Sequence, residues 1–267
     1  ELATVCWQHS GPATSQRRSE EAVAFPRRAL ATLDAPPASQ RLRASILSAL
    51  AFALVWQRDF DAARGHYEEA LAIRRAVDGE PSTSVIETLS NLANLEEGCE
   101  RYEAAAQRNQ IAVAFSRRLF GPRDQRLALV LFRQGGVLNR LERFEEARIA
   151  LEECLEIANA ADFALPSVRA DMRWTLAHCL EKLGLDEAAL VQLREAEALL
   201  VASTREDRDA ALAFVRYRLA LLLRERDPSG AEAAARSSLD LHEKLYGSAH
   251  PGSQAMKKLL REVGADK

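Results

Sequence analysis

The chain has 267 residues, and its 36 basic and 39 acidic side chains leave a formal net charge of −3. A pI near 6.1 gives no electrostatic reason to expect direct binding of nucleic acid. No run approaches the roughly 18 consecutive apolar residues that cross a bilayer, so we expect no membrane insertion. Aromatic residues make up only 6%, and alanine supplies much of the 48% hydrophobic content, which favours close-packed helices over a β-sheet.

Residues 1–40 are expected to form one degenerate helical hairpin. Its first helix would be the run Leu2–Gln8. Its second helix would carry Ala22 and Ala29, whose seven-residue spacing recurs in the later units. Pro26 lies inside this second pattern and should kink or delay the helix, because its ring removes one backbone hydrogen bond and clashes with the preceding turn.

From residue 41 to residue 251, small residues recur at a fixed interval of 42. One row is Ala63, Ala105, Ala147, Ala189 and Ala231, and a second is Ala70, Ala112, Cys154, Ala196 and Ser238. A third row is Ala51, Ala93, Gly135 and Ala177, broken only by Leu219. A fixed period of this length is typical of stacked identical units rather than of one globular core. The sequence therefore predicts five 42-residue repeats.

Each repeat is predicted to contain two helices. In the first repeat, Leu47, Leu50 and Leu54 form the i, i+3, i+7 stripe of one helical face. The second helix begins after Asp59, a residue type that caps helix N-termini, and ends at Gly79, a residue type that terminates helices. The later repeats follow the same plan. The sequence thus indicates a series of helical hairpins.

The rows of small residues mark the places where helices cross, because two helices approach closely only where their side chains are short. On the outward faces of the second helices, opposite charges are spaced four residues apart. We expect Arg64 to pair with Glu68, and Arg148 with Glu152. Residues 252–267 are expected to form a terminal capping helix and a tail.

Within a repeat, small residues stand 12 and 19 positions after Ala51, which resembles the tetratricopeptide repeat (TPR). The interval of 42 in place of the usual 34 resembles the kinesin-light-chain subtype of that repeat. Residues 247–251 match the Gly-x-x-His-Pro marker of the subtype, and residues 90–95 are close to its Asn-Asn-Leu-Ala-x-Leu run. The resemblance covers residues 41–263. It implies an all-α fold, a right-handed α-solenoid of TPR-like helix-turn-helix repeats.

No residue pattern indicates catalysis, a cofactor or a metal site, and we expect the chain not to be an enzyme. A phosphate-binding loop of the Gly-x-x-x-x-Gly-Lys type is absent. His242-Glu243 lacks the second histidine of a zinc-protease motif. His250 belongs to the inter-unit marker, where a structural cap is its expected role. The pair Gly135-Gly136 falls inside a helix pattern and indicates close packing rather than a phosphate cradle.

The four cysteines, Cys6, Cys99, Cys154 and Cys179, form no Cys-x-x-Cys pair. Cys154 occupies one of the small packing positions, so we expect it to be a buried free thiol. Free thiols persist in reducing compartments, which indicates a cytoplasmic location.

In TPR stacks the first helix of each hairpin lines a concave groove. The resemblance carries this role to ten residues, namely Ser90, Asn91, Asn94, Phe132, Arg133, Asn139, Trp174, His178, Arg216 and Tyr217. Amides suit a peptide backbone because they donate and accept together, and aromatic side chains are the anchors enriched at binding sites. A competing interpretation is that each aromatic side chain merely packs against the neighbouring hairpin.

A second alternative for the groove, an acidic C-terminal tail as ligand, is disfavoured. The clamps that bind such tails place Lys three positions before the small residue. Here those places hold Ser48, Ser90, Phe132 and Trp174, and Arg133 alone would fit such a clamp.

The sequence therefore predicts a module that binds a protein or peptide partner in its groove. The chain starts at Glu1 rather than Met, so we expect it to be the interaction or regulatory region of a larger bacterial multidomain protein. One alternative is an intramolecular arm that regulates an attached signalling enzyme, such as a Ser/Thr kinase. Another is the peptide-signal receptor of a transcriptional regulator.

Overall fold

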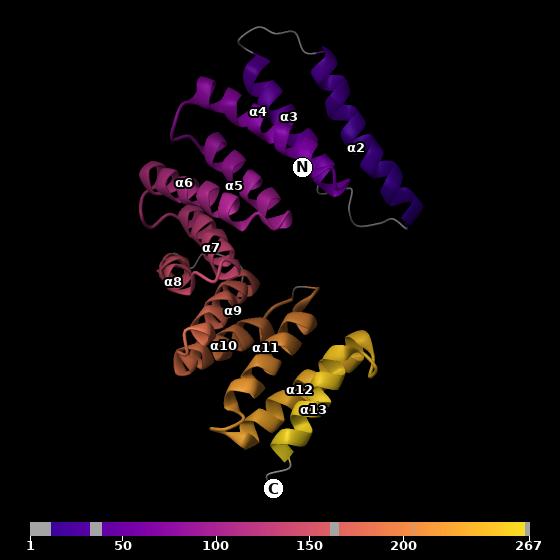
Figure 1. Cartoon of the computed structure of the whole chain (residues 1–267), viewed down its shortest axis with the longest axis vertical. Coiled ribbons are helices and arrows are strands. Elements are labelled where there is room, and N and C mark those ends of the chain that lie inside the picture. Colours follow the sequence, from indigo (N-terminus) through magenta and orange to yellow (C-terminus); the bar gives the residue numbers. More distant parts are fainter. Residues whose placement is uncertain (1–11, 33–38, 161–165, 205, 265–267) are drawn as a thin grey trace. The chain divides into compact units, whose positions relative to one another are not determined.

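The computed structural model describes residues 12–32, 39–160, 166–204 and 206–264, and within them every regular element is a helix (Figure 1). The helices are α2 (Pro12–Thr32), α3 (Gln40–Trp56), α4 (Phe60–Asp78), α5 (Thr83–Gly98), α6 (Tyr102–Phe120), α7 (Gln125–Arg140), α8 (Phe144–Ala160), α9 (Pro166–Lys182), α10 (Asp186–Val201), α11 (Arg208–Leu223), α12 (Pro228–Tyr246) and α13 (Pro251–Gly264). The all-α helical-repeat fold predicted from the sequence is confirmed.

Consecutive helices pack as hairpins, in the pairs α3/α4, α5/α6, α7/α8, α9/α10 and α11/α12. The chain divides into two compact parts, unit 1 (residues 1–122) and unit 2 (residues 123–267). In unit 1, α2 packs on α3, and α4 joins the first hairpin to α5. In unit 2, α8 packs on α9, α10 packs on α11, and α13 packs on α12. Each hairpin therefore buries its apolar faces against its neighbours within its own unit.

The rows of small residues lie in the core, as their spacing predicted. All five members of the Ala63 row and all five members of the Ala70 row are 0% exposed. In the third row Gly135 is buried in α7, and a Cβ at that position would collide with the Leu151 side chain of α8. Close helix crossing is therefore the physical reason why these positions hold small residues.

Helix ends also follow the repeat. The Asp59 carboxylate accepts a hydrogen bond from the Ala62 backbone N–H at 3.3 Å and caps α4. Helices α4, α6 and α12 end at Gly79, Gly121 and Gly247, whose φ angles are 75°, 90° and 83°. These left-handed backbone angles carry no steric cost only for glycine, so the predicted helix stops are confirmed.

The prediction for Pro26 needs correction. Helix α2 begins at Pro12 and continues through Pro26 to Thr32, so proline does not delay it. Pro26 is buried, and α2 packs along α3. Tertiary packing therefore outweighs the loss of one backbone hydrogen bond. The first helix predicted for this region, Leu2–Gln8, lies outside the described residues.

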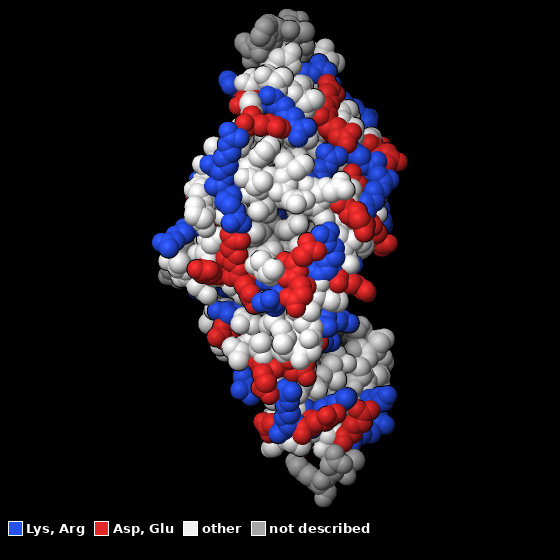
Figure 2. All heavy atoms as spheres, turned by 60° about the vertical axis from the view of Figure 1, so that its left-hand side comes forward, with Lys and Arg blue, Asp and Glu red and all other residues white. Residues whose placement is uncertain are grey.

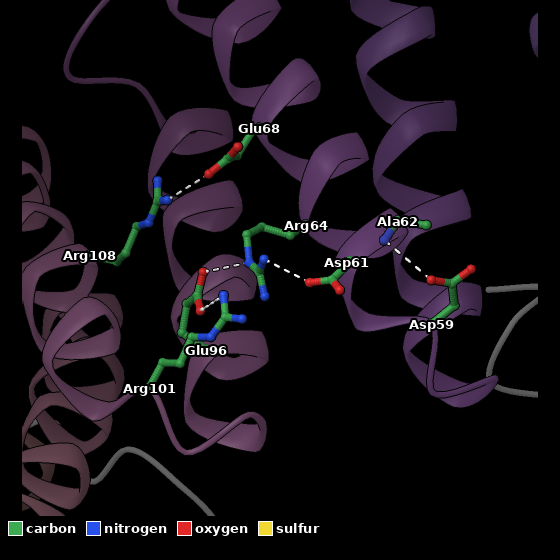
Figure 3. A network of polar contacts seen from close by, with 8 residues as sticks. All are labelled: Asp59, Asp61, Ala62, Arg64, Glu68, Glu96, Arg101 and Arg108. Carbon is green, nitrogen blue, oxygen red and sulfur yellow. Dashed lines mark hydrogen bonds and ion pairs between the residues drawn. The ribbon is translucent and has the colours of Figure 1, made fainter.

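The predicted i, i+4 ion pairs are confirmed on one helix and wrong on another. Arg148 in α8 does bind its predicted partner four residues later, at 3.0 Å. Arg64 in α4 instead directs its Nε to the Glu96 carboxylate of α5 at 3.0 Å, and Glu68 binds Arg108 of α6 at 2.9 Å (Figure 3). A rule based on one helix could not anticipate these partners, because they come from the next hairpin.

The junction between α12 and α13 contains the Gly-x-x-His-Pro marker. The His250 Nδ1 accepts a hydrogen bond from the Gly252 backbone N–H at 3.1 Å, directly before the first turn of α13. The structural cap expected for His250 is therefore confirmed. Helix α13 buries Met256, Leu259 and Val263 and leaves polar side chains exposed.

Candidate peptide-binding face

The candidate site in unit 2 lies on the first helices of its hairpins, α7, α9 and α11. Two side-chain contacts tie these helices together. The Asn139 amide of α7 donates through Nδ2 to the Thr175 carbonyl of α9 at 3.1 Å. Further along α9, Glu181 forms an ion pair with Arg218 of α11. Because His178 lies on α9 between these two contacts, we call this surface of α7, α9 and α11 the His178 face.

Three rings form the centre of the His178 face. The Trp174 indole stacks on the His178 imidazole, with centroids 6.2 Å apart and an interplanar angle of 11°. Phe214 of α11 meets the same indole edge-on at 5.3 Å and 69°. Trp174 is half-buried, and Phe214 is 41% exposed. The rings therefore serve both purposes considered for them, since they pack across two helices and also leave apolar area in contact with water.

An open cavity of about 310 Å³ adjoins these rings. Trp174 and Phe214 line it together with the aliphatic side chains Leu200 and Val215, and Asp171 supplies one carboxylate. Apolar walls with few polar groups are typical of pockets that take the anchor side chain of a ligand.

Positive charge surrounds the centre of the face. The pKa of His178 lies below its ordinary value because burial penalises the charged ring. Arg218, Lys182 and Arg140 lower that pKa further by electrostatic repulsion. His178 is therefore neutral at pH 7, and the cations around it are the fixed charges of the site.

The other residues predicted in unit 2 occupy different surroundings. Phe132 on α7 and Tyr217 on α11 are half-buried, and Arg133 is exposed. The Asn139 amide is already used in the contact to α9. Arg216 donates to Glu197 of α10 at 2.6 Å and to a serine of α12, so its charge links second helices and is not directed at the His178 face.

In unit 1 the predicted residues lie on α5. Ser90 is only 4% exposed, which leaves it too little surface for a ligand contact. Asn91 is half-buried and Asn94 is exposed. On α3, Phe52 and Trp56 are 51% and 60% exposed and meet edge-on at 6.1 Å. This part of unit 1 therefore offers amides and aromatic rings to a ligand.

Sequence reasoning missed Phe214 and Arg218. The interval of 42 aligns Phe214 with Thr88, Val130 and Met172, all buried, so its register indicated core. The available signal was the residue type, since an aromatic ring replaces smaller side chains at this position. Arg218 carried no signal, because its partner comes from a different hairpin.

Other kinds of site find no support in the described residues. Within them no group of three or more His, Cys, Asp or Glu side chains could hold a metal ion. No helix of the described part of the chain has both the length and the apolar character needed to cross a membrane. Cys99, Cys154 and Cys179 are free thiols, and burial raises the pKa of Cys154 to about 12, which makes this thiol unreactive.

Known proteins share both the repeat and the fold. The model of the tetratricopeptide repeat family matches residues 42–110 and 84–160. No curated protein sequence matches the chain. Among solved structures, BtubC (BKLC) from P. vanneervenii is similar, with 20% identity and a TM-score of 0.72 over 88% of this chain and 92% of that one.

Two further structures show the same fold. One is a signal transduction ATPase with numerous domains (STAND) with a tetratricopeptide repeat sensor, from Pyrococcus horikoshii, at 16% identity and a TM-score of 0.77. That match covers 95% of this chain and 37% of the larger protein. The other is YrrB, a TPR protein with an unusual peptide-binding site, at 17% identity and a TM-score of 0.53 over 80% of this chain and 91% of that one. The family model therefore places the tetratricopeptide repeat over residues 42–160, and helical hairpins of the same fold continue to α13.

Proposed function

We propose that the chain is a protein-interaction scaffold whose His178 face holds a peptide segment of a partner. The observation that carries this proposal is the cavity beside Trp174 and Phe214. It is mostly apolar and lies between the first helices α9 and α11, with Leu200 of the second helix α10 completing its wall; first helices line the groove of TPR proteins. The YrrB structure is described as having a peptide-binding site, which supports the same use of the fold here.

Binding energy should concentrate at the aromatic anchors. Trp174 and Phe214 would enclose one apolar side chain of the peptide. The amides of Asn91 and Asn94 make no hydrogen bond within the described part of the chain, so they remain available to a peptide backbone in unit 1. We therefore assign the anchor to unit 2 and a secondary, uncharged contact to unit 1.

The test begins with peptides selected from a random display library against the purified chain. Affinity of the best peptide is then measured by calorimetry for Trp174→Ala/Phe214→Ala. We expect a loss of at least about tenfold, which is the usual cost of removing a buried anchor.

The matched control is Phe52→Ala/Trp56→Ala, which removes an exposed aromatic pair from unit 1. This variant should retain affinity within about threefold. If the two double variants lose affinity equally, or if the Trp174 variant binds unchanged while its helicity is intact, the anchor does not lie at the His178 face.

A second candidate is a sensor arm within a larger signalling protein. The similarity to the STAND sensor protein favours it, because that match covers nearly this whole chain and only 37% of the larger protein. Under this proposal, peptide binding would change the activity of an attached domain, as in the kinase and transcriptional-regulator alternatives. Assay of the full-length parent with and without the selected peptide distinguishes a sensor from a passive scaffold.

We also place the protein in the cytoplasm of a bacterium. The three described cysteines are free thiols. Such thiols persist in a reducing compartment. Fractionation of the source cells with antibody detection tests this location directly.

A further inference from the structure

Two cations at the ends of α7 and α9 have no acidic partner. Arg140 and Lys182 are both exposed, and neither forms an ion pair or hydrogen bond with any described residue. Other cations of the same helices have an acidic partner, as Arg126 has in Asp124 and Arg173 in Glu195. Over much of the face shown in Figure 2, basic and acidic side chains lie next to one another. What sets Arg140 and Lys182 apart is their position beside His178, whose pKa both of them lower.

Two side-chain contacts between helices place these cations near His178. Asn139, the neighbour of Arg140, reaches the Thr175 carbonyl, three residues before His178 on α9. Glu181, the neighbour of Lys182, lies three residues after His178 on α9. It forms an ion pair with Arg218 of α11. The end of α7 therefore contacts α9 three residues before His178, and α11 contacts α9 three residues after it.

Helix ends explain why these cations persist without carboxylates. Arg140 is the last residue of α7 and Lys182 is the last residue of α9. The negative ends of the two helix dipoles stabilise both charges. His178, whose pKa is lowered by burial and by these cations, adds a neutral ring with one N–H donor.

The charged side chains near His178 carry a net charge of two positive units. Arg140, Lys182 and Arg218 contribute three positive charges, and Glu181 removes one through its ion pair with Arg218. A carboxylate would neutralise half of this surplus, whereas a phosphoryl group carries close to two negative charges at pH 7. Arginine also binds phosphoryl oxygens in two-point geometry.

We propose that Arg140, His178 and Lys182 form a binding site for a doubly charged oxyanion, the phosphoryl group of a phosphorylated side chain on the segment docked at the His178 face. The proposal rests on the proposed function for the identity of that segment. The site itself should bind free phosphate weakly, because the packed helices α7 and α9 carry Arg140 and Lys182 whether or not a peptide is present.

The first experiment uses inorganic phosphate as the probe and the His178 imidazole as the reporter. Two-dimensional ¹H–¹³C NMR resolves the five histidines of the chain. Phosphate should shift the His178 resonance saturably and raise its pKa, because a bound dianion offsets the surrounding cations. Acetate and chloride at equal ionic strength should do so far less.

Variants then locate the site. Arg140→Gln/Lys182→Gln should weaken phosphate binding about fivefold or more, since two charge-assisted contacts are lost. The matched control is Arg123→Gln/Arg194→Gln, which removes two exposed cations of unit 2 elsewhere on its surface and should change affinity less than about twofold. Equal effects of the two double variants, or an equal response of His178 to phosphate and chloride, would overturn the proposal.

A second experiment separates free phosphate from a phosphorylated side chain. The library-selected peptide is synthesised with Ser, Glu or phosphoserine at each position flanking its anchor. We expect phosphoserine to bind more tightly than glutamate at one position, and Arg140→Gln/Lys182→Gln to remove that difference. If no position prefers phosphoserine while the Trp174 anchor still operates, the oxyanion site is refuted and the scaffold function remains.

Discussion

Glu96 in α5 and Leu180 in α9 occupy the same position of the repeat, two periods apart. In unit 1 the Glu96 side chain is 4% exposed and is held by Arg64 at 3.0 Å and Arg101 at 3.7 Å. In unit 2 Leu180 fills the equivalent space, and among the described residues Arg148, the counterpart of Arg64, forms ion pairs only within its own helix. The repeat thus fixes the size of a core side chain. Whether that side chain can be charged depends on the partner that the neighbouring helix supplies.

At this core position unit 1 is the charged unit, but among the candidate site residues of the first helices unit 2 is the charged one. The first helices of unit 1 carry the neutral amides Asn91 and Asn94, and those of unit 2 carry the uncompensated cations Arg140 and Lys182. The buried Glu96 of unit 1 is neutralised by its partners, whereas the exposed Arg140 and Lys182 of unit 2 have no acidic partner among the described residues. Four predictions test this comparison, from the largest expected effect to the smallest.

The largest effect should come from the packing rows, which the two units share. Ala105→Trp in unit 1 and Ala147→Trp in unit 2 each insert a large ring at a position with no exposed surface. Each should lower the free energy of unfolding by about 3 kcal/mol, because overpacking displaces a helix crossing. Urea denaturation followed by circular dichroism measures the loss.

The control for both variants is Gln107→Trp, at an exposed position of α6. It should change the free energy of unfolding by roughly 0.5 kcal/mol or less. A loss confined to one unit would show that the rows are packing positions in that unit only.

The next effect concerns Glu96 alone. Glu96→Ala should cost about 2 kcal/mol, since it leaves Arg64 partly buried without its main partner. The double variant Arg64→Leu/Glu96→Leu replaces the whole ion pair by apolar side chains and should recover at least half of that loss. No recovery in denaturation experiments would mean that the polar junction fits unit 1 better than the apolar one does.

The sequence alone predicted which small residues are buried, because side-chain size recurs with the period of 42 residues. The Ala63 and Ala70 rows are fully buried as predicted, and the glycine helix stops occur where they were expected. The partners of Arg64, Glu68 and Arg218 could not be predicted in this way, since each lies on another hairpin and its choice depends on three-dimensional distance.

The candidate site was predictable only in part. Trp174 and His178 followed from the register of the TPR groove, and the structure brings them together with Phe214. Ser90 and Arg216 shared that register, but one is buried and the other is paired with α10. The register of a residue predicts which helix face it occupies. Whether it can contact a ligand depends on its burial and on its partners in the folded chain.

The third prediction concerns alkaline pH and Cys154, the thiol at a position that is alanine in three other repeats. Burial raises the pKa of the folded thiol to about 12, above its unfolded value. The neutral thiol is therefore favoured by folding, so this contribution is intact below the unfolded pKa and is lost as pH rises through the folded pKa. Near pH 10 wild type should have lost about 1 kcal/mol through this group.

Cys154→Ala removes that pH dependence and matches Ala70 and Ala112 of unit 1 in type. Unfolding free energies measured in urea at pH 8 and pH 10 should therefore fall less in the variant than in wild type. Identical falls would mean that Cys154 ionises as freely in the folded protein as in the unfolded chain.

The smallest effect is expected at Glu68, whose ion pair joins two helices where the corresponding pair of unit 2 stays within one helix. Glu68 binds Arg108 across two helices at 2.9 Å, whereas the corresponding Arg148 pair in unit 2 stays within α8. Both pairs are solvated, and an exposed pair gains little over its interactions with water. Glu68→Ala should thus change the free energy of unfolding by roughly 0.5 kcal/mol or less at 0.15 M salt. A loss as large as that of Ala105→Trp would show that the ion pair between α4 and α6, and not the alanine rows, holds the hairpins of unit 1 together.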